Sequence, residues 1–158
     1  MVDFVSKLRY DINDLKKLMS ILRSEQGCAW DREQTHKSIR SNIIEEANET
    51  VCAIDDENTE ELLEELGDVL MQVVFHADIA NDNGDFNFDD VVNATCKKLV
   101  RRHPHVFGSM LAITSSEALN FWEDIKLIEK RIKEQGHRIS EVSLEELEEL
   151  YRRSKLEK

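Results

Sequence analysis

Four acidic residues are spaced in two pairs that could bind a hard divalent cation. Glu46 and Glu49 are three residues apart, and so are Glu65 and Asp68. Residues with this spacing are neighbours on one face of a helix, so each pair would present two carboxylates from one flank. Carboxylate ligands favour Mg²⁺, with Mn²⁺ as an alternative, over zinc or copper. The simpler interpretation is that these acids only solvate a helix surface.

The stretch from residue 45 to residue 68 is predicted to position these acids. It holds eleven acidic residues and no Lys or Arg. Apolar residues recur at helical spacing around Ala47 and again around Leu66, which predicts two amphipathic helices joined by a tight turn. With the turn centred on Glu57, antiparallel packing would bring both acidic pairs to the same height. Four converging carboxylates repel one another, so they need a cation or a shifted pKa.

Further polar residues lie beside this acidic set. On the helical wheel Glu45 points away from the cation-binding flank, so it would bind from a partner subunit, position the attacking water or form a surface ion pair. Asn42 lies one turn before Glu46, where its amide could contact the base or the sugar or hold Glu46 in place. Gln72 and His76 continue the flank of the second helix, and we expect an interhelical contact for His76 rather than ligation.

Five segments of the sequence form an ordered set. They are CAWDREQTH at 28–36, Glu-Glu-x-x-Glu at 45–49, ELGDVLMQVVFHA at 65–77, KKLVRRHPHVFG at 97–108 and FWEDIK at 121–126. In these segments and in their order, the sequence resembles the MazG family of all-α nucleoside triphosphate pyrophosphohydrolases over about residues 8–130. The resemblance implies a Mg²⁺ cofactor. The catalytic residues that follow from it are Glu45, Glu46 and Glu49, and the metal ligands are Glu46, Glu49, Glu65 and Asp68.

The resemblance also implies which residues bind the substrate. The implied nucleotide contacts are Lys98, Arg102, Trp122 and Lys126, with Arg101 as a further candidate. The alternative for the cations is that they oppose a helix macrodipole, and the alternative for Trp122 is core packing. Trp30 would form a wall of the pocket or a hydrophobic staple over a helix start, with Asp31 as the N-cap and Gln34 completing a capping box.

The length and composition favour one all-α domain over residues 1–158. The chain has 158 residues with one Pro and five Gly, which fits an antiparallel bundle of five to six helices. The expected helices cover residues 2–24, 32–55, 59–81, 87–103, 115–135 and 144–155, with a loop over 104–113 and a divergent extension over 137–158. Capping boxes are expected at Thr114 with Glu117 and at Ser143 with Glu146.

The charge and the cysteines restrict the partners. A net charge of -12 argues against a nucleic acid polymer, which needs a basic footprint. Three widely spaced cysteines are typical of reduced thiols in a cytoplasmic protein, and we expect neither a membrane span nor a signal peptide. Slender helices with apolar flanks favour self-association, as a homodimer or a homotetramer.

Together with the resemblance, these features predict Mg²⁺-dependent hydrolysis of a nucleoside triphosphate. Water would attack the α-phosphorus in line and release pyrophosphate and a nucleoside monophosphate, while Lys98, Arg102 and Lys126 neutralise the departing pyrophosphate. No P-loop pattern is present, which argues against kinase or motor chemistry. Two alternatives stay open: a narrow dUTP or dCTP pyrophosphatase, and a catalytically silent nucleotide-binding scaffold or regulatory protein.

Overall fold

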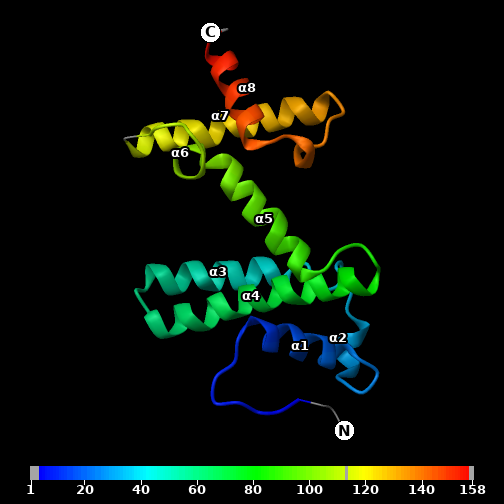
Figure 1. Cartoon of the computed structure of the whole chain (residues 1–158). Coiled ribbons are helices and arrows are strands. Elements are labelled where there is room, and N and C mark those ends of the chain that lie inside the picture. Colours follow the sequence, from blue (N-terminus) through cyan, green and yellow to red (C-terminus); the bar gives the residue numbers. More distant parts are fainter. Residues whose placement is uncertain (1–3, 113, 157–158) are drawn as a thin grey trace. The chain divides into compact units, whose positions relative to one another are not determined.

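The computed structural model describes residues 4–112 and 114–156, and within these ranges it contains helices and no strands. The all-α prediction is therefore confirmed (Figure 1). The helices are α1 (Ile12–Arg23), α2 (Ala29–Glu33), α3 (Asn42–Asp55), α4 (Thr59–Asp82), α5 (Phe88–Arg102), α6 (Pro104–Phe107), α7 (Ser115–Glu134), the 3-10 helix η1 (Ile139–Glu141) and α8 (Leu144–Leu156). The chain forms two compact units, one ending at Val91 and one beginning at Val92. Whether they make one domain stays a prediction.

The first unit is organised around the α3–α4 hairpin, whose two helices lie side by side (Figure 1). The turn between them is short, as the sequence predicts. Glu57 in this turn has a φ of 53°, a left-handed conformation that is unfavourable for a residue with a side chain. Asn58 then caps α4, because its side-chain oxygen accepts a hydrogen bond from the backbone N–H of Glu61 at 3.3 Å.

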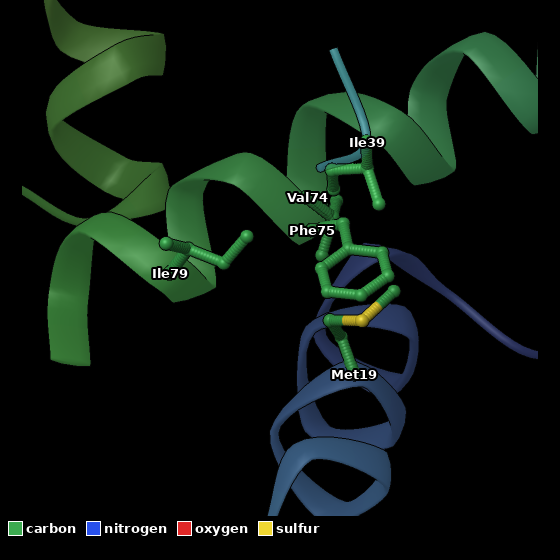
Figure 2. Close-up of a cluster of buried hydrophobic side chains, with 5 residues drawn as sticks. All are labelled: Met19, Ile39, Val74, Phe75 and Ile79. Carbon is green, nitrogen blue, oxygen red and sulfur yellow. The ribbon is translucent and has the colours of Figure 1, made fainter. Parts of the chain in front are cut away.

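The core of the first unit lies at the C-terminal half of α4. Figure 2 shows Phe75 of α4 pointing toward Met19 of α1, with Ile39 on the opposite side next to Val74. Ile79 extends the cluster by one turn of α4. Ile39 belongs to the segment 34–41 between α2 and α3, so this segment is anchored to α4 by a buried side chain.

A buried arginine fastens the end of α1 to α4. Arg23 donates from Nε to Asp78 at 2.8 Å, from Nη2 to Asp82 at 2.5 Å and from Nη1 to the carbonyl of Asp31 at 3.1 Å. Its guanidinium also lies 5.5 Å from the ring centroid of Phe75. The buried positive charge of Arg23 is therefore compensated by two carboxylates and by a carbonyl acceptor.

The prediction of one helix over residues 32–55 is wrong. The chain forms α2 and α3 instead, α2 is capped at Cys28 rather than at Asp31, and Gln34 ends it. Between the helices, the backbone N–H of Thr35 donates to Ser38 Oγ at 2.9 Å and that of Ser38 donates to Thr35 Oγ1 at 3.2 Å. Such local side-chain to backbone bonds compete with helical ones, which explains the break.

Two other boundaries differ from the prediction. The first helix begins at Ile12, because Asp11 caps it in a capping box with Asp14; the predicted start at Val2 lies outside the described residues. The segment 104–113 was expected to be a loop, but Pro104 starts the short helix α6, as proline is tolerated in a first helical turn. Ile113, the predicted end of that loop, also lies outside the described ranges.

The second unit contains most of α5, followed by α6, α7, η1 and α8. The capping box of Thr114 with Glu117 is confirmed. At the start of α8, the backbone N–H of Ser143 donates to Glu146 at 2.8 Å, and that of Glu146 donates to Ser143 Oγ at 3.1 Å, so the second box is confirmed too. Gly136 ends α7 with a φ of 82°. The core of this unit consists of Ile125, Ile128, Ile132 and Leu147.

Among the residues that the structure describes, no helix combines the length and the apolar character that crossing a membrane requires.

Candidate functional site

The α3–α4 hairpin gathers three of the four predicted metal ligands. Glu46 and Glu49 of α3 and Glu65 of α4 each offer one carboxylate oxygen, and these three oxygens all lie within 4.8 Å of one another. Glu46 and Glu49 come from one helix turn, and Glu65 comes from the facing helix, as the symmetric spacing about the turn predicts. The cluster is therefore built by the pairing of two helices and not by one helix surface alone.

Asp68, the fourth predicted ligand, lies beside this cluster on α4. It is not one of the residues whose oxygens all fall within 4.8 Å. Its charge nevertheless contributes to the raised pKa values of both Glu46 and Glu65. The negative charges of the four acids therefore act on one another, although Asp68 does not belong to the closest group.

The pKa values of two carboxylates in the cluster are raised. For Glu46 the largest cause is burial, followed by the charges of Asp68 and Glu49. For Glu65 burial is again the largest cause, followed by the charges of Glu49 and Asp68. Burial and like charge both disfavour an ionised carboxyl group. Binding of either protons or a cation therefore stabilises the cluster.

One oxygen of the cluster is suited to a metal ion. Glu65 Oε2 is buried and has no hydrogen-bond partner among the described residues. A buried acceptor without a partner costs free energy, and a charged one costs more. A donor set made only of carboxylate oxygens fits Mg²⁺ or Mn²⁺. The residues of the cluster therefore fit a hard divalent cation.

Gln72 supports the cluster, although the set of predicted site residues does not include it. It is buried on α4, and its Nε2 donates to Glu46 Oε1 at 3.4 Å. The sequence does carry a signal, since Gln72 lies four residues after Asp68 on the predicted cation-binding flank. Asn42 was expected either to contact the base or the sugar or to hold Glu46, and its Oδ1 accepts from Ser41 Oγ at 3.5 Å.

Glu45 and Trp30 lie at exposed positions. Glu45 is exposed to solvent, and its charge raises the pKa of Glu46 less than the charges of Asp68 and Glu49 do. This agrees with the helical wheel, which turns Glu45 away from the cluster. Trp30 lies inside α2 and is 58% exposed, so it does not form the buried staple that was the structural alternative for it.

His76, four residues beyond Gln72, contacts another histidine. The Nδ1 atoms of His36 and His76 lie 2.8 Å apart, which joins the segment 34–41 to α4. His76 therefore has the structural contact that the sequence favours, but with a residue from a non-helical segment. Burial, followed by the charge of His36, lowers the pKa of His76.

The predicted phosphate-binding arginines lie in the second unit, where Glu129 of α7 binds both. Arg101 Nε donates to Glu129 Oε1 at 3.0 Å, and Arg102 Nη2 donates to Glu129 Oε2 at 2.8 Å. The guanidinium of Arg102 also lies 4.8 Å from the ring centroid of Trp122. Two predicted substrate residues, Arg102 and Trp122, are thus in direct contact.

The two predicted lysines are exposed side chains of the second unit. Lys98 lies one turn before Arg102 on α5, and Lys126 lies one turn after Trp122 on α7. Lys126 forms an exposed salt bridge within α7, with its Nζ 3.5 Å from Glu123 Oε2. Surface pairs of this kind contribute little to stability, so Lys126 can exchange this partner for an anionic ligand at little cost.

Comparison with known proteins identifies a family domain in this chain. The family model of the MazG nucleotide pyrophosphohydrolase domain matches residues 34–107. The matched range contains all four acidic residues of the site together with Lys98, Arg101 and Arg102. It leaves out Trp30 on one side, and Trp122 and Lys126 on the other.

Curated relatives extend the similarity beyond the matched domain. A nucleoside triphosphate pyrophosphohydrolase/pyrophosphatase MazG of Thermotoga maritima is 48% identical over 130 residues, which are 82% of this chain and 49% of that protein. A nucleoside triphosphate pyrophosphohydrolase of Escherichia coli K12 is 40% identical over 151 residues, or 93% of this chain and 57% of the relative. The chain spans about half the length of these curated relatives.

Proposed function

Because this chain belongs to the MazG family, we propose that it is a nucleoside triphosphate pyrophosphohydrolase that requires Mg²⁺. The reaction joins the oxygen of water to the α-phosphorus and breaks the bond between that phosphorus and the oxygen that bridges to the β-phosphate. The products are a nucleoside monophosphate and pyrophosphate. We propose nucleoside and deoxynucleoside triphosphates as the substrate class.

The observation that carries this proposal is the convergence of Glu46, Glu49 and Glu65 from two helices within 4.8 Å. Carboxylates held this close are unfavourable without a counter-charge, as the raised pKa values of Glu46 and Glu65 indicate. Structural ion pairing does not account for them, because none of the ion pairs among the described residues includes one of these carboxylates. A cation that also binds phosphate oxygens accounts for both features.

The acidic residues are assigned distinct roles. Glu46, Glu49, Glu65 and Asp68 would hold Mg²⁺, which when bound polarises the phosphate and makes a water more acidic. Gln72 orients the Glu46 carboxylate, and Glu45 would position the water or stay at the surface.

The nucleotide contacts are assigned to residues of α2, α3, α5 and α7. Lys98, Arg102 and Lys126 would bind the phosphates, because the pyrophosphate that departs carries several negative charges. Trp122 has a ring edge and face beside Arg102 that suit a base or a sugar, and Trp30 has an exposed ring that suits the same contact. Asn42 and Arg101 are the further candidates.

The test is an assay of nucleoside and deoxynucleoside triphosphates with Mg²⁺, in which pyrophosphate and monophosphate are both quantified. We expect turnover of several triphosphates by the wild-type protein. Changing Glu49→Gln should lower kcat by about 100-fold or more, because even groups that only support a metal ligand contribute about 10–100-fold. Glu60→Gln is the matched control, since Glu60 is an exposed acid on α4 outside the cluster.

The outcomes separate the alternatives. Hydrolysis of dUTP or dCTP alone would replace the broad substrate class by a narrow one. Tight nucleotide binding without turnover would replace the enzyme by a nucleotide-binding scaffold. Equal activity of the Glu49→Gln and Glu60→Gln variants would remove the acidic cluster from the mechanism.

We also propose that the protein forms a homodimer or a homotetramer. Large apolar side chains are exposed along one face of each hairpin helix. They are Ile43, Ile44, Val51 and Ile54 on α3, and Leu63, Leu66, Leu70 and Val73 on α4. An apolar surface this long is typical of an interface. Sedimentation should therefore give the mass of an oligomer, and Leu63→Arg should shift it toward the monomer while Leu127→Arg on α7 should not.

We also propose that the protein is located in the cytoplasm, where cysteines are kept reduced. Cys28, Cys52 and Cys96 are all free thiols in the part of the chain that the structure describes. Free thiols persist in compartments that keep cysteine reduced. Fractionation of cells should recover the protein with cytoplasmic markers.

A further inference from the structure

We infer that Glu129 is a positioning residue that orients the guanidinium group of Arg102, and with it that of Arg101, for binding the phosphates of the substrate. The inference rests on the proposed function and adds to it a residue outside the acidic cluster. All of the side chains that carry it lie in the second unit, on α5 and α7.

Glu129 is a buried acid whose two oxygens are both occupied by arginine. The residue is only 6% exposed. Its Oε1 accepts from Arg101 Nε at 3.0 Å, and its Oε2 accepts from Arg102 Nε at 3.1 Å and from Arg102 Nη2 at 2.8 Å. A carboxylate is rarely buried without such partners, and these bonds use the edge of each guanidinium that includes Nε.

The charges of this cluster do not cancel. One carboxylate faces two guanidinium groups, so the Glu129–Arg101–Arg102 cluster keeps an excess positive charge. Because Glu129 occupies Nε and Nη2 of Arg102, the Nη1 side of that guanidinium points away from the carboxylate. The excess charge and the outward N–H groups suit an anionic ligand with several oxygens, such as a phosphate.

A second contact restricts Arg102 from another direction. Its guanidinium lies 4.8 Å from the ring centroid of Trp122, and the same ring meets His103 edge-on at 5.3 Å between centroids. The guanidinium group of Arg102 is therefore held at one edge by Glu129 and lies over the ring of Trp122. Ordering a long side chain before the ligand arrives lowers the entropy lost on binding.

The experiment measures binding of inorganic pyrophosphate with Mg²⁺ by the fluorescence of Trp122. The Trp30→Phe variant leaves Trp122 as the sole tryptophan, because the chain has two. In this background we expect Glu129→Gln to raise the Kd for pyrophosphate about tenfold, the size of one lost charge-assisted contact. Glu134→Gln is the matched control on the exposed face of α7, and it should leave Kd unchanged.

A double-mutant cycle separates positioning from folding. Since Glu129 acts through Arg102, Glu129→Gln should have little further effect on Kd once Arg102→Ala is present. A merely structural role would instead lower Tm in both backgrounds without changing Kd. If Glu129→Gln does not fold, Glu129→Asp replaces it; this variant keeps the charge, is too short to reach both arginines, and should raise Kd to a similar extent.

The results also distinguish this inference from the proposed function. An unchanged Kd in the folded Glu129 variant, an equal loss in the Arg102→Ala background, or no pyrophosphate binding by the parent protein would each overturn the inference. Binding that depends on Glu129 in a protein that hydrolyses no triphosphate would support the inference and overturn the proposed function. Hydrolysis with a Kd that Glu129→Gln leaves unchanged would do the reverse.

Discussion

His36 and His76 share one proton between their Nδ1 atoms, which lie 2.8 Å apart. The ring planes differ by 6° and the centroids are 5.1 Å apart, so the rings meet edge to edge in nearly one plane. Only one of the two nitrogens can carry hydrogen in this bond. A further proton on the accepting nitrogen would set two N–H groups against each other and break the bond.

The first prediction concerns the pH dependence of stability. The pKa of His76 is lowered in the folded protein, chiefly by burial, from an ordinary value of about 6.5. Because the pKa of His76 is lower in the folded protein, the unfolded chain takes up a proton there at a higher pH than the folded protein does. The contribution of neutral His76 to stability is therefore present above about pH 6.5 and is lost as the pH falls toward the lower folded value. We expect Tm to fall by about 2–4 °C for each kcal/mol lost.

Thermal unfolding of a matched pair of variants checks this prediction. His76→Asn should lower Tm at neutral pH and weaken the dependence of Tm on pH between about 7.5 and 5.5, a range that brackets the ordinary pKa of histidine. His137→Asn changes an exposed histidine of the second unit and should keep the wild-type dependence. An undiminished pH dependence in the His76 variant would refute the shared proton.

The second prediction is that the acidic cluster destabilises the metal-free protein. The pKa values of Glu46 and Glu65 are raised by burial and by like charges, so their contribution to stability is present below the unfolded value and is lost as the pH rises through the folded value. In the presence of a chelator at neutral pH, Glu65→Gln should therefore raise Tm. Adding Mg²⁺ should raise Tm of the wild-type protein and much less that of the variant.

Differential scanning calorimetry with and without Mg²⁺ provides the measurement. Glu60→Gln, a change to an exposed acid on the same helix, should respond to Mg²⁺ as the wild-type protein does. A Glu65→Gln variant that is less stable than the wild-type protein in chelator would show that the cluster is held by contacts other than charge.

The third prediction concerns Gln72. Its hydrogen bond to Glu46 lowers the pKa of that carboxyl and opposes the effect of burial. Gln72→Leu keeps most of the volume but removes the donor, so the pKa of Glu46 should rise further. The pH of half-maximal Mg²⁺ binding should shift upward, and the affinity at neutral pH should fall about tenfold, as for other groups that orient a metal ligand.

Isothermal titration calorimetry with Mg²⁺ at several pH values tests this shift. Gln26→Leu changes an exposed glutamine outside the site and serves as the control. A Gln72 variant with unchanged affinity at every pH would mean that Glu46 keeps its orientation without this bond.

The fourth prediction concerns the buried cation Arg23. Arg23→Met removes the partner of Asp78, a carboxyl whose pKa burial raises and the Arg23 hydrogen bond lowers. Breaking a buried ion pair at one side costs about 3–5 kcal/mol. Urea denaturation should show this loss, and part of it should be recovered in the double variant Arg23→Met with Asp78→Asn.

The control for this loss is Arg32→Met, which changes an exposed arginine with a single hydrogen bond to a carbonyl. It should alter the free energy of unfolding by about 0.5 kcal/mol or less. An equal loss in both variants would mean that the network of Arg23 contributes no more than a surface contact.

The sequence predicts those features that depend on residues close together in the chain. The turn around Glu57, the start of α4 and the capping boxes at Thr114 and Ser143 follow from turn and capping chemistry within four residues. The gathering of Glu46, Glu49 and Glu65 also follows, because a short turn makes the two helices antiparallel and so relates their spacings.

Other features depend on contacts between distant segments and were not predicted. The break over residues 34–41 combines the local bonds of Thr35 and Ser38 with a distant contact, in which Ile39 reaches the core beside Phe75, far along the chain. Periodicity marks Leu66 as the centre of an apolar stripe, yet its side chain is exposed, since periodicity identifies an apolar face but not what covers it. The contact of Glu129 with two arginines was not predicted either, because periodicity within α5 and α7 does not show how the segment 103–114 brings these helices together.

Because the turn at Glu57 is short, it restricts the insertions and deletions that the chain can accept there. Inserting or deleting one residue there would shift the register between α3 and α4 by one position. Because successive residues of a helix lie about 100° apart, the residue brought opposite Glu46 would no longer be Glu65. Most surface turns tolerate such changes in length, but this one acts as a spacer that sets the register of the two acidic pairs. Substitutions in the turn should therefore be accepted far more readily than insertions or deletions.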